Sequence, residues 1–138
     1  FYTVNDQIKC RDFWMPFAPT ILDSAAHKYL QDYDPDRAEA PYMITAFSAT
    51  ELGIKELRAS IHQGDHTLRP QVLRPEHNPT YYRLVKEFEA LSGIGAVLNT
   101  SFNLHGYPLA ATLDQALMTF EQSGLRHMAL GSFLISKE

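Results

Sequence analysis

A short apolar run followed at once by a polar turn constrains this chain more than any other stretch. Residues 95–98 (Gly-Ala-Val-Leu) predict a buried strand, and residues 99–103 then place amides and hydroxyls in a row before Gly106-Tyr107-Pro108 breaks the backbone. Polar loops at the ends of buried strands are where α/β-type proteins commonly bind ligands. The alternative is a connection whose Asn and Ser side chains satisfy its own backbone. The pattern alone leaves both interpretations open.

The length, net charge and cysteine count of the chain disfavour several classes of protein. At 138 residues the chain fits one domain, residues 1–138, although a start at Phe1 without Met indicates a fragment of a longer protein. The net charge of −4 disfavours a nucleic-acid partner. Cys10 is the only cysteine, which excludes an intrachain disulfide and suits a reducing, cytoplasmic location. Neither a membrane span nor a signal peptide is visible.

Hydrophobic periodicity predicts helices and strands in alternation. Pro16 and Pro19 exclude a helix and a central strand over residues 13–22, while residues 20–22 are free to pair with a sheet. The expected helices cover residues 1–11, 23–30, 79–92 and 112–123, and residues 50–57 are expected to form a short helix or a turn. The expected strands cover residues 42–49, 67–72, 95–98 and 127–135.

Capping residues give the clearest boundaries. Asn78 at the N-cap with Pro79 at N1 opens one helix, which Ser92-Gly93 ends. Thr112 with Gln115 forms a capping box for the last helix, and Asp23 is the expected cap of an earlier one. The expected buried stripes of the two long helices are Tyr81, Leu84, Val85, Phe88 and Leu91, and Leu113, Ala116, Leu117 and Phe120.

Residues 67–72 alternate as a strand does, with Thr67, Arg69 and Gln71 on one face. Arg69 offers the planar fork that matches phosphate or carboxylate, but an exposed sheet face has the same pattern. His62, Asp65 and His66 suggest a metal site, yet Gly64 opposes a helix there and no third ligand is evident, so no metal is predicted. Lys9 and Arg11 lie at the C-terminal end of the first expected helix, where positive charge complements the helix dipole. Cations of an ordinary solvated helix end have the same pattern.

Three motifs keep a familiar order along nearly the whole chain. They are residues 9–12 leading to residues 16–19, then residues 62–65 with Thr67, Arg69 and Gln71, and finally residues 99–103 with 105–106 and Pro108. The closing Ser123-Gly124-Leu125 and Leu130-Gly131 also match. On these motifs the chain resembles the C-terminal domain of the NodU/CmcH-type O-carbamoyltransferases.

The resemblance implies an α+β (α/β-like) fold, with a YrdC-like twisted mixed sheet and packed helices. It implies that this domain binds carbamoyl phosphate and ATP with Mg²⁺ and forms carbamoyl adenylate. An N-terminal Kae1-like domain with a bound metal would then transfer the carbamoyl group to an acceptor hydroxyl. The implied phosphate-handling residues are Lys9, Arg69, Asn99 and Ser101, with Arg11 and Asn103 as further candidates. Lys9, Arg69 and Ser101 are the implied catalytic residues.

Elementary chemistry fits these implied roles. Attack of a carbamate-type oxygen on the α-phosphorus of ATP brings two anions together, and fixed cations and donors offset their repulsion. Lys9 would act as a point charge and Arg69 as a fork, while Asn99 and Ser101 would hold the carbamoyl oxygens and amide. Mg²⁺ would be bound mainly through the phosphates.

The chain departs from the family at two positions, and a rival function stays open. Met15 replaces an Arg that often precedes the Pro-Phe-x-Pro segment, and Tyr107 replaces a Glu after His-Gly, so one phosphate contact and the acceptor side are in doubt. The rival is a non-catalytic module of the same fold that binds nucleotide or RNA, or that only holds the partner domain. Arg58, Arg69, Arg74 and Arg83 keep an RNA surface open despite the acidic balance.

Overall fold

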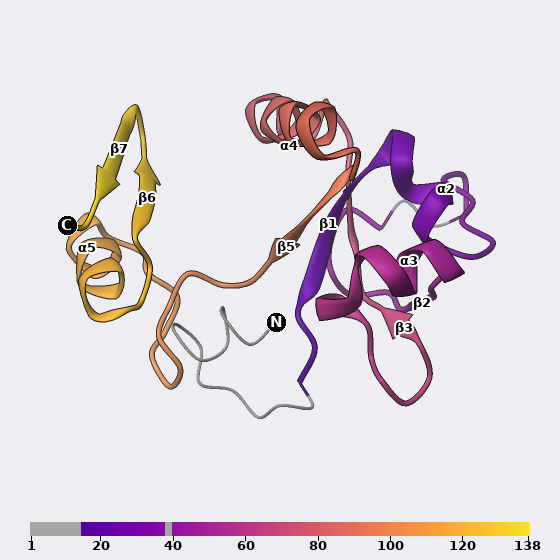
Figure 1. Cartoon of the computed structure of the whole chain (residues 1–138), viewed down its shortest axis with the longest axis horizontal. Coiled ribbons are helices and arrows are strands. Elements are labelled where there is room, and N and C mark those ends of the chain that lie inside the picture. The colour runs from indigo at the N-terminus through magenta and orange to yellow at the C-terminus, as the bar shows by residue number, and fades with distance from the viewer. Residues whose placement is uncertain (1–14, 38–39) are drawn as a thin grey trace. The chain divides into compact units, whose positions relative to one another are not determined.

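The computed structural model describes residues 15–37 and 40–138 (Figure 1). Residues within Trp14–Thr100 form one compact unit, called the large unit below, and the described part of the second is Ser101–Glu138, the C-terminal unit. The helix expected over residues 1–11 lies outside the described residues, and the expectation of a single domain stays a prediction. No described helix is long and apolar enough to cross a membrane.

A three-stranded mixed sheet forms the centre of the large unit. β1 (Ala18–Leu22) lies between β4 (Gln71–Leu73), which is parallel to it, and β5 (Ala96–Asn99), which is antiparallel. Thr20 lies opposite Gln71 on one side, and Ala18 lies opposite Asn99 on the other. This mixed sheet with packed helices confirms the predicted α+β class.

The sequence-based exclusion of a central strand at Pro19 is wrong. The Leu22 N–H donates to the Gly95 oxygen, so alternation along β1 turns the nitrogen of Pro19 toward the β4 side. Pairing with β4 begins only at Thr20, one residue later. The missing N–H of Pro19 therefore costs the sheet no hydrogen bond.

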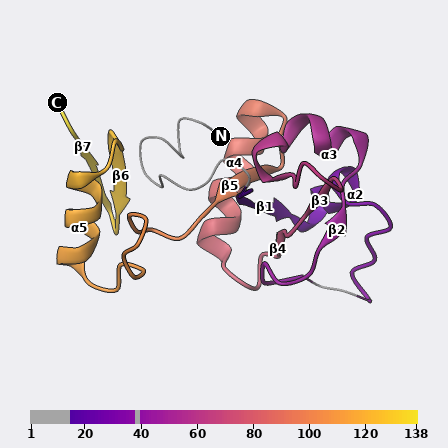
Figure 2. The ribbon, with the colours of Figure 1, turned by 90° about the horizontal axis from the view of Figure 1, so that it is seen from below.

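Helices and 3-10 turns complete the large unit. They are η2 (Asp23–Ala25), α2 (Ala26–Tyr29), α3 (Glu51–Glu56), η3 (Arg58–Ser60) and α4 (Pro79–Ser92). α4 contacts β1 and β5 (Figure 2), and it begins and ends as predicted, with the Asn78 side chain accepting from the Tyr81 N–H and Gly93 left-handed at the C-cap. The buried core includes Ile21, Leu22, Tyr29, Val72 and Val85.

Several expected elements are shorter or capped differently. Asp23 does not cap the first helix of this unit, because its Oδ1 accepts from the Ser24 N–H and the Tyr82 hydroxyl instead. Of the strand expected over residues 42–49, only β2 (Phe47–Ser48) forms, since Tyr42 and Ile44 are exposed in a turn.

The strand expected over residues 67–72 is broken at Arg69-Pro70. β3 (Thr67–Leu68) pairs with β2, whereas β4 joins the central sheet, because Pro70 has no N–H with which to continue one ladder. The predicted alternation is nevertheless confirmed, since Leu68, Pro70 and Val72 are buried while Arg69 is exposed.

The C-terminal unit contains α5 (Leu113–Gln122) and a hairpin of β6 (His127–Leu130) and β7 (Phe133–Ser136). The capping box of Thr112 and Gln115 is confirmed. The single strand expected over residues 127–135 is a hairpin, because Gly131 turns the chain with a φ of +58°.

The predicted apolar stripes of the two long helices are buried only in part. Val85 and Phe120 are buried, whereas the remaining large aliphatic and Phe members stay exposed: Leu84, Phe88, Leu91, Leu113 and Leu117.

Candidate functional site

Three polar side chains meet on one face of the central sheet. The Asn99 amide nitrogen donates to Thr20 Oγ1 at 2.9 Å and to Gln71 Oε1 at 3.3 Å, and the Thr20 hydroxyl donates to Gln71 Oε1 at 3.0 Å. The Gln71 Nε2 in turn donates to the Pro41 carbonyl at 3.3 Å. Thr20, Gln71 and Asn99 are called the amide–hydroxyl cluster below.

The strand register produces this cluster. Thr20 and Gln71 are direct partners across β1 and β4, so their side chains leave the same face of the sheet. Asn99 of β5 lies opposite Ala18 of β1, and its side chain reaches Thr20 diagonally. Thr20 is fully buried, and its hydroxyl both donates and accepts, which fixes the orientations of the two amides.

The cluster leaves one acceptor available. Both bonds of the Asn99 side chain use its nitrogen, so its Oδ1 has no hydrogen-bond partner in the described part of the chain. An amide oxygen at this place can accept from an N–H or O–H of a ligand but supplies no charge. Charge for an anionic ligand has to come from elsewhere.

Arg69 is the described cation closest in sequence to this cluster. It lies two residues before Gln71, between β3 and β4, and its side chain is exposed. Within residues 15–37 and 40–138 no carboxylate pairs with its guanidinium, which leaves the fork available to phosphate or carboxylate. Thr67, the other member of the predicted polar row, donates to Asp65 Oδ1 at 2.7 Å.

Ser101 and Asn103 belong to the C-terminal unit. The Ser101 hydroxyl donates to Asn103 Oδ1 at 2.6 Å, and the Asn103 Nδ2 donates to the Tyr107 carbonyl at 2.6 Å. Gly106, with a φ of +84°, helps the chain to turn there. These bonds match the self-satisfying connection that the sequence left open, and a ligand role for either side chain stays a prediction.

The predicted site residues are thus described in two separate groups. Arg69 and Asn99 lie in the large unit, and Ser101 and Asn103 lie in the C-terminal unit. Lys9 and Arg11 lie outside the described residues. That cations from distant parts of the chain gather around the polar turn therefore stays a prediction.

The turn at residues 62–65 has a structural explanation. Asp65 Oδ1 accepts from the Thr67 hydroxyl, from the Thr67 N–H at 3.0 Å and from the His62 ring at 2.9 Å. These bonds, those from Thr67 first, lower the pKa of Asp65 to about 2. Within the described ranges, no group of three His, Cys, Asp or Glu side chains is placed to hold a metal ion.

Sequence reasoning missed the central role of Thr20. It placed Gln71 on a polar face and Asn99 at a strand end, but it treated Thr20 only as part of a strand. A single hydroxyl in the apolar run Pro19-Thr20-Ile21-Leu22 was the available signal, because a buried hydroxyl needs a partner.

Comparison with known proteins gives a family match over nearly the whole chain. The family model described as "Carbamoyltransferase C-terminus" matches residues 2–137. An uncharacterized protein of Methanocaldococcus jannaschii is 39% identical over 134 residues, covering 97% of this chain and 25% of that protein. Nodulation protein NolNO of Sinorhizobium fredii is 30% identical over 97% of this chain and 19% of its own length.

A relative with an enzyme's name matches as well. The 3'-hydroxymethylcephem-O-carbamoyltransferase of Amycolatopsis lactamdurans is 29% identical over 91% of this chain and 23% of that protein. The chain therefore spans a quarter or less of the length of these relatives. With a family match from residue 2 to residue 137, the chain belongs to the carbamoyltransferase C-terminus family.

Proposed function

We propose that this chain is the C-terminal part of an O-carbamoyltransferase. The observation that carries the proposal is the family match over residues 2–137, and the carbamoyltransferase name of one relative supports it. Because the relatives are about four times longer, the remaining machinery would lie in the rest of the polypeptide. An N-terminal Kae1-like domain with its own metal is the proposed partner.

The proposed role of this domain is to activate the carbamoyl group. Carbamoyl phosphate first loses phosphate to water and gives carbamate. A carbamate oxygen then bonds to the α-phosphorus of ATP as the bond to the bridging α,β-oxygen breaks, and pyrophosphate leaves. The acceptor hydroxyl next attacks the carbamoyl carbon, AMP leaves, and the hydroxyl proton passes to a base.

Arg69 would bind phosphate, because its exposed guanidinium has no carboxylate partner among the described residues and matches phosphate oxygens in two parallel bonds. Lys9 and Arg11 would add positive charge from the N-terminal residues. Mg²⁺ would accompany ATP mainly through its phosphates.

The amide–hydroxyl cluster would orient the carbamoyl end. The free Oδ1 of Asn99 can accept from the carbamoyl NH₂, and its own nitrogen is held by Thr20 and Gln71, so the acceptor is preoriented. Ser101 and Asn103, in the following turn of the C-terminal unit, are proposed as further residues that bind the substrates.

Calorimetry with ATP and with carbamoyl phosphate tests the proposal on the 138-residue chain. Arg69→Ala is expected to weaken binding about tenfold or more, because it removes a charge-assisted, two-pronged contact. Arg58→Ala, at another exposed position of the same unit, is the matched control and is expected to bind as the unmodified chain does. Equal binding by Arg69→Ala, or no binding by the unmodified chain, would contradict the assignment.

A second assay tests whether carbamoyl transfer needs the rest of the polypeptide. The reactive adenylate hydrolyses in water, so transfer needs a shelter that the rest of the polypeptide would provide. The 138-residue chain alone is expected not to carbamoylate an acceptor hydroxyl. Full transfer activity by this chain would overturn that part of the proposal.

A further inference from the structure

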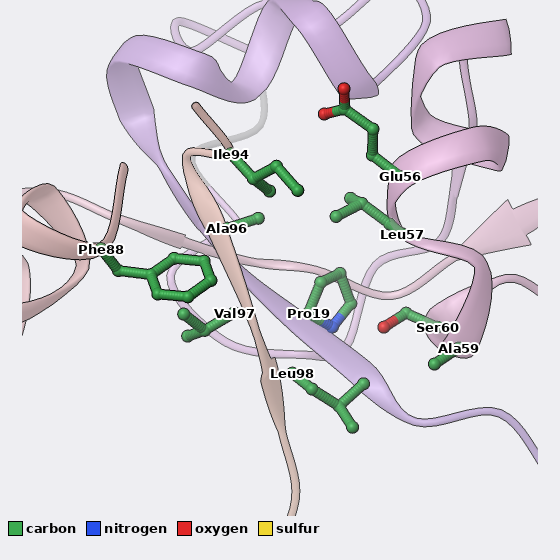
Figure 3. Close-up of a pocket in the computed structure, with 10 residues that line it drawn as sticks. All are labelled: Pro19, Glu56, Leu57, Ala59, Ser60, Phe88, Ile94, Ala96, Val97 and Leu98. Atoms are coloured by element: carbon green, nitrogen blue, oxygen red, sulfur yellow. The ribbon is translucent and has the colours of Figure 1, made fainter. Parts of the chain in front are cut away.

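A pocket of about 380 Å³ opens in the large unit (Figure 3), and none of the three residues of the amide–hydroxyl cluster is among those that line it. Pro19 and Leu98 are direct partners across β1 and β5 and line it. Their chain neighbours Thr20 and Asn99 carry the cluster, so alternation along the strands puts the Pro19 and Leu98 side chains on the opposite face of the sheet. Val97, the register partner of Thr20, also lines the pocket from the face of the cluster.

Most of the wall is apolar. Phe88 of α4 and Val97 lie on one side of β5, and Ile94 and Leu98 lie on the other side with Leu57 from the end of α3 (Figure 3). Phe88 is 42% exposed, so an aromatic ring is available for stacking. A volume of this size and an apolar lining with a few polar groups are typical of small-molecule pockets.

One hydroxyl in the pocket has no partner. Ser60 is only 3% exposed, and Figure 3 shows its Oγ pointing toward Pro19. Its N–H donates to the Leu57 carbonyl at 2.8 Å, but within the described ranges no group bonds to the hydroxyl. No side-chain nitrogen or oxygen among the described residues is both buried and without a hydrogen-bond partner, so the Ser60 Oγ is open to the pocket and can bond to a molecule that fills it.

A carboxylate at the rim restricts the charge of that ligand. Glu56 lines the pocket, and its Oε2 accepts from the Tyr29 hydroxyl at 2.9 Å. Burial and this bond raise the pKa of Tyr29 to about 12, so the phenol stays a donor across the ordinary pH range. A negative group fixed beside an apolar wall repels anions, and none of the described residues that line the pocket is a cation.

We propose that this pocket binds a small uncharged molecule with a ring and a hydroxyl group, the ring against the apolar residues that line the pocket and the hydroxyl on Ser60 Oγ. The Ser60 hydroxyl can donate to or accept from the ligand hydroxyl. The site differs in chemistry from the phosphate site proposed above, because its polar groups are a hydroxyl and a carboxylate.

Three probes of one size test the proposal: benzyl alcohol, toluene and benzoate. Titration into the ¹⁵N-labelled 138-residue chain, followed by amide chemical shifts, gives both affinity and location. Benzyl alcohol is expected to bind with a Kd on the order of millimolar and to shift the amides of residues 56–60 and 94–98. Toluene should bind more weakly, and benzoate should not bind.

Two variants assign the contacts. Ser60→Ala is expected to weaken benzyl alcohol about threefold to tenfold and to leave toluene unchanged, because only the hydrogen bond is lost. Phe88→Ala should weaken both probes alike. Ser48→Ala and Leu91→Ala are the matched controls, since both residues are exposed outside the pocket, and the amide spectrum of each variant reports whether the fold is kept.

The outcomes separate cleanly. Preference for the alcohol that disappears in Ser60→Ala supports the proposal. It is overturned if no probe shifts these amides, if benzoate binds as well as benzyl alcohol, or if Ser60→Ala keeps the preference. None of these results depends on ATP, so the test is independent of the carbamoyltransferase assignment.

Discussion

The two units differ in how much of their apolar surface they bury. The large unit holds every fully buried large side chain of the described residues, among them Tyr29, Ile21 and Leu22. In the C-terminal unit only Phe120 and Met128 are buried among the described hydrophobic residues. Six large apolar side chains there are exposed, namely Tyr107, Leu109, Leu113, Leu117, Phe133 and Leu134. Burial of side chains that are distant in sequence therefore stabilises the large unit, whereas contacts between residues close in sequence contribute most of the stability of the C-terminal unit.

Local contacts are well developed in the C-terminal unit. Lys137 Nζ donates to the Ser123 carbonyl at 2.6 Å and to the Glu121 carbonyl at 3.1 Å, and it lies 4.7 Å from the centre of the Phe120 ring. The Lys137 side chain thus ties the chain after β7 to the end of α5. Such bonds fix geometry but stabilise less than a buried core does.

The strongest test of this comparison removes an apolar side chain from each unit. Ile21→Ala, at a fully buried position of the central strand, should lower the free energy of unfolding by about 2–5 kcal/mol. Leu134→Ala, at a position that is 74% exposed, should change it by less than about 0.5 kcal/mol. Urea unfolding followed by circular dichroism measures both, and similar losses would show that the units do not differ in this way.

Sequence patterns predicted the features that neighbouring residues decide. Asn78, Pro79 and Gly93 gave both ends of α4 correctly, and Thr112 with Gln115 gave the capping box of α5. These signals work because the cap and the groups it satisfies lie within a few residues of each other.

The features that needed distant partners were not predicted. Helical spacing put Leu84 beside Val85 on one apolar face, but only Val85 meets the core while Leu84 is 65% exposed. Thr20 and Asn99 are 79 residues apart, and only the strand order β4-β1-β5 brings them together. Periodicity identifies a face but not the neighbour that covers it.

A substitution at the N-cap of α5 tests the comparison between the units and is expected to have an effect of intermediate size. Thr112→Ala removes the acceptor for the Gln115 N–H and half of the capping box, which should cost α5 about 1 kcal/mol. Hydrogen exchange of the α5 amides should rise about fivefold, because little burial protects this helix, while β1 amides stay unchanged. Gln122→Ala, exposed at the other end of α5, is the control. Equal acceleration in β1 would indicate that the two units unfold together.

The smallest effect is expected from an exposed hydrogen-bonded carboxylate in the large unit. The pKa of Asp65 is lowered to about 2, chiefly by the two bonds from Thr67. Above pH of about 4 the carboxylate is ionised in both the folded and unfolded chain, and its stabilisation is fully present. As pH falls from about 4 toward 2, the unfolded chain takes up the proton first, so this contribution is lost.

Asp65→Asn should therefore flatten the dependence of stability on pH in that window, with a slightly less stable protein at pH 7 and little change near pH 2. Thr67→Val removes one of the two leading donors and should raise the pKa of Asp65 partway toward 4, as the ¹³C shift of its carboxyl reports. A carboxyl that titrates near 4 in the unmodified chain would contradict the bonding at this turn. An effect as large as that of Ile21→Ala would mean that local bonds match core burial even in the large unit, which removes the contrast between the units.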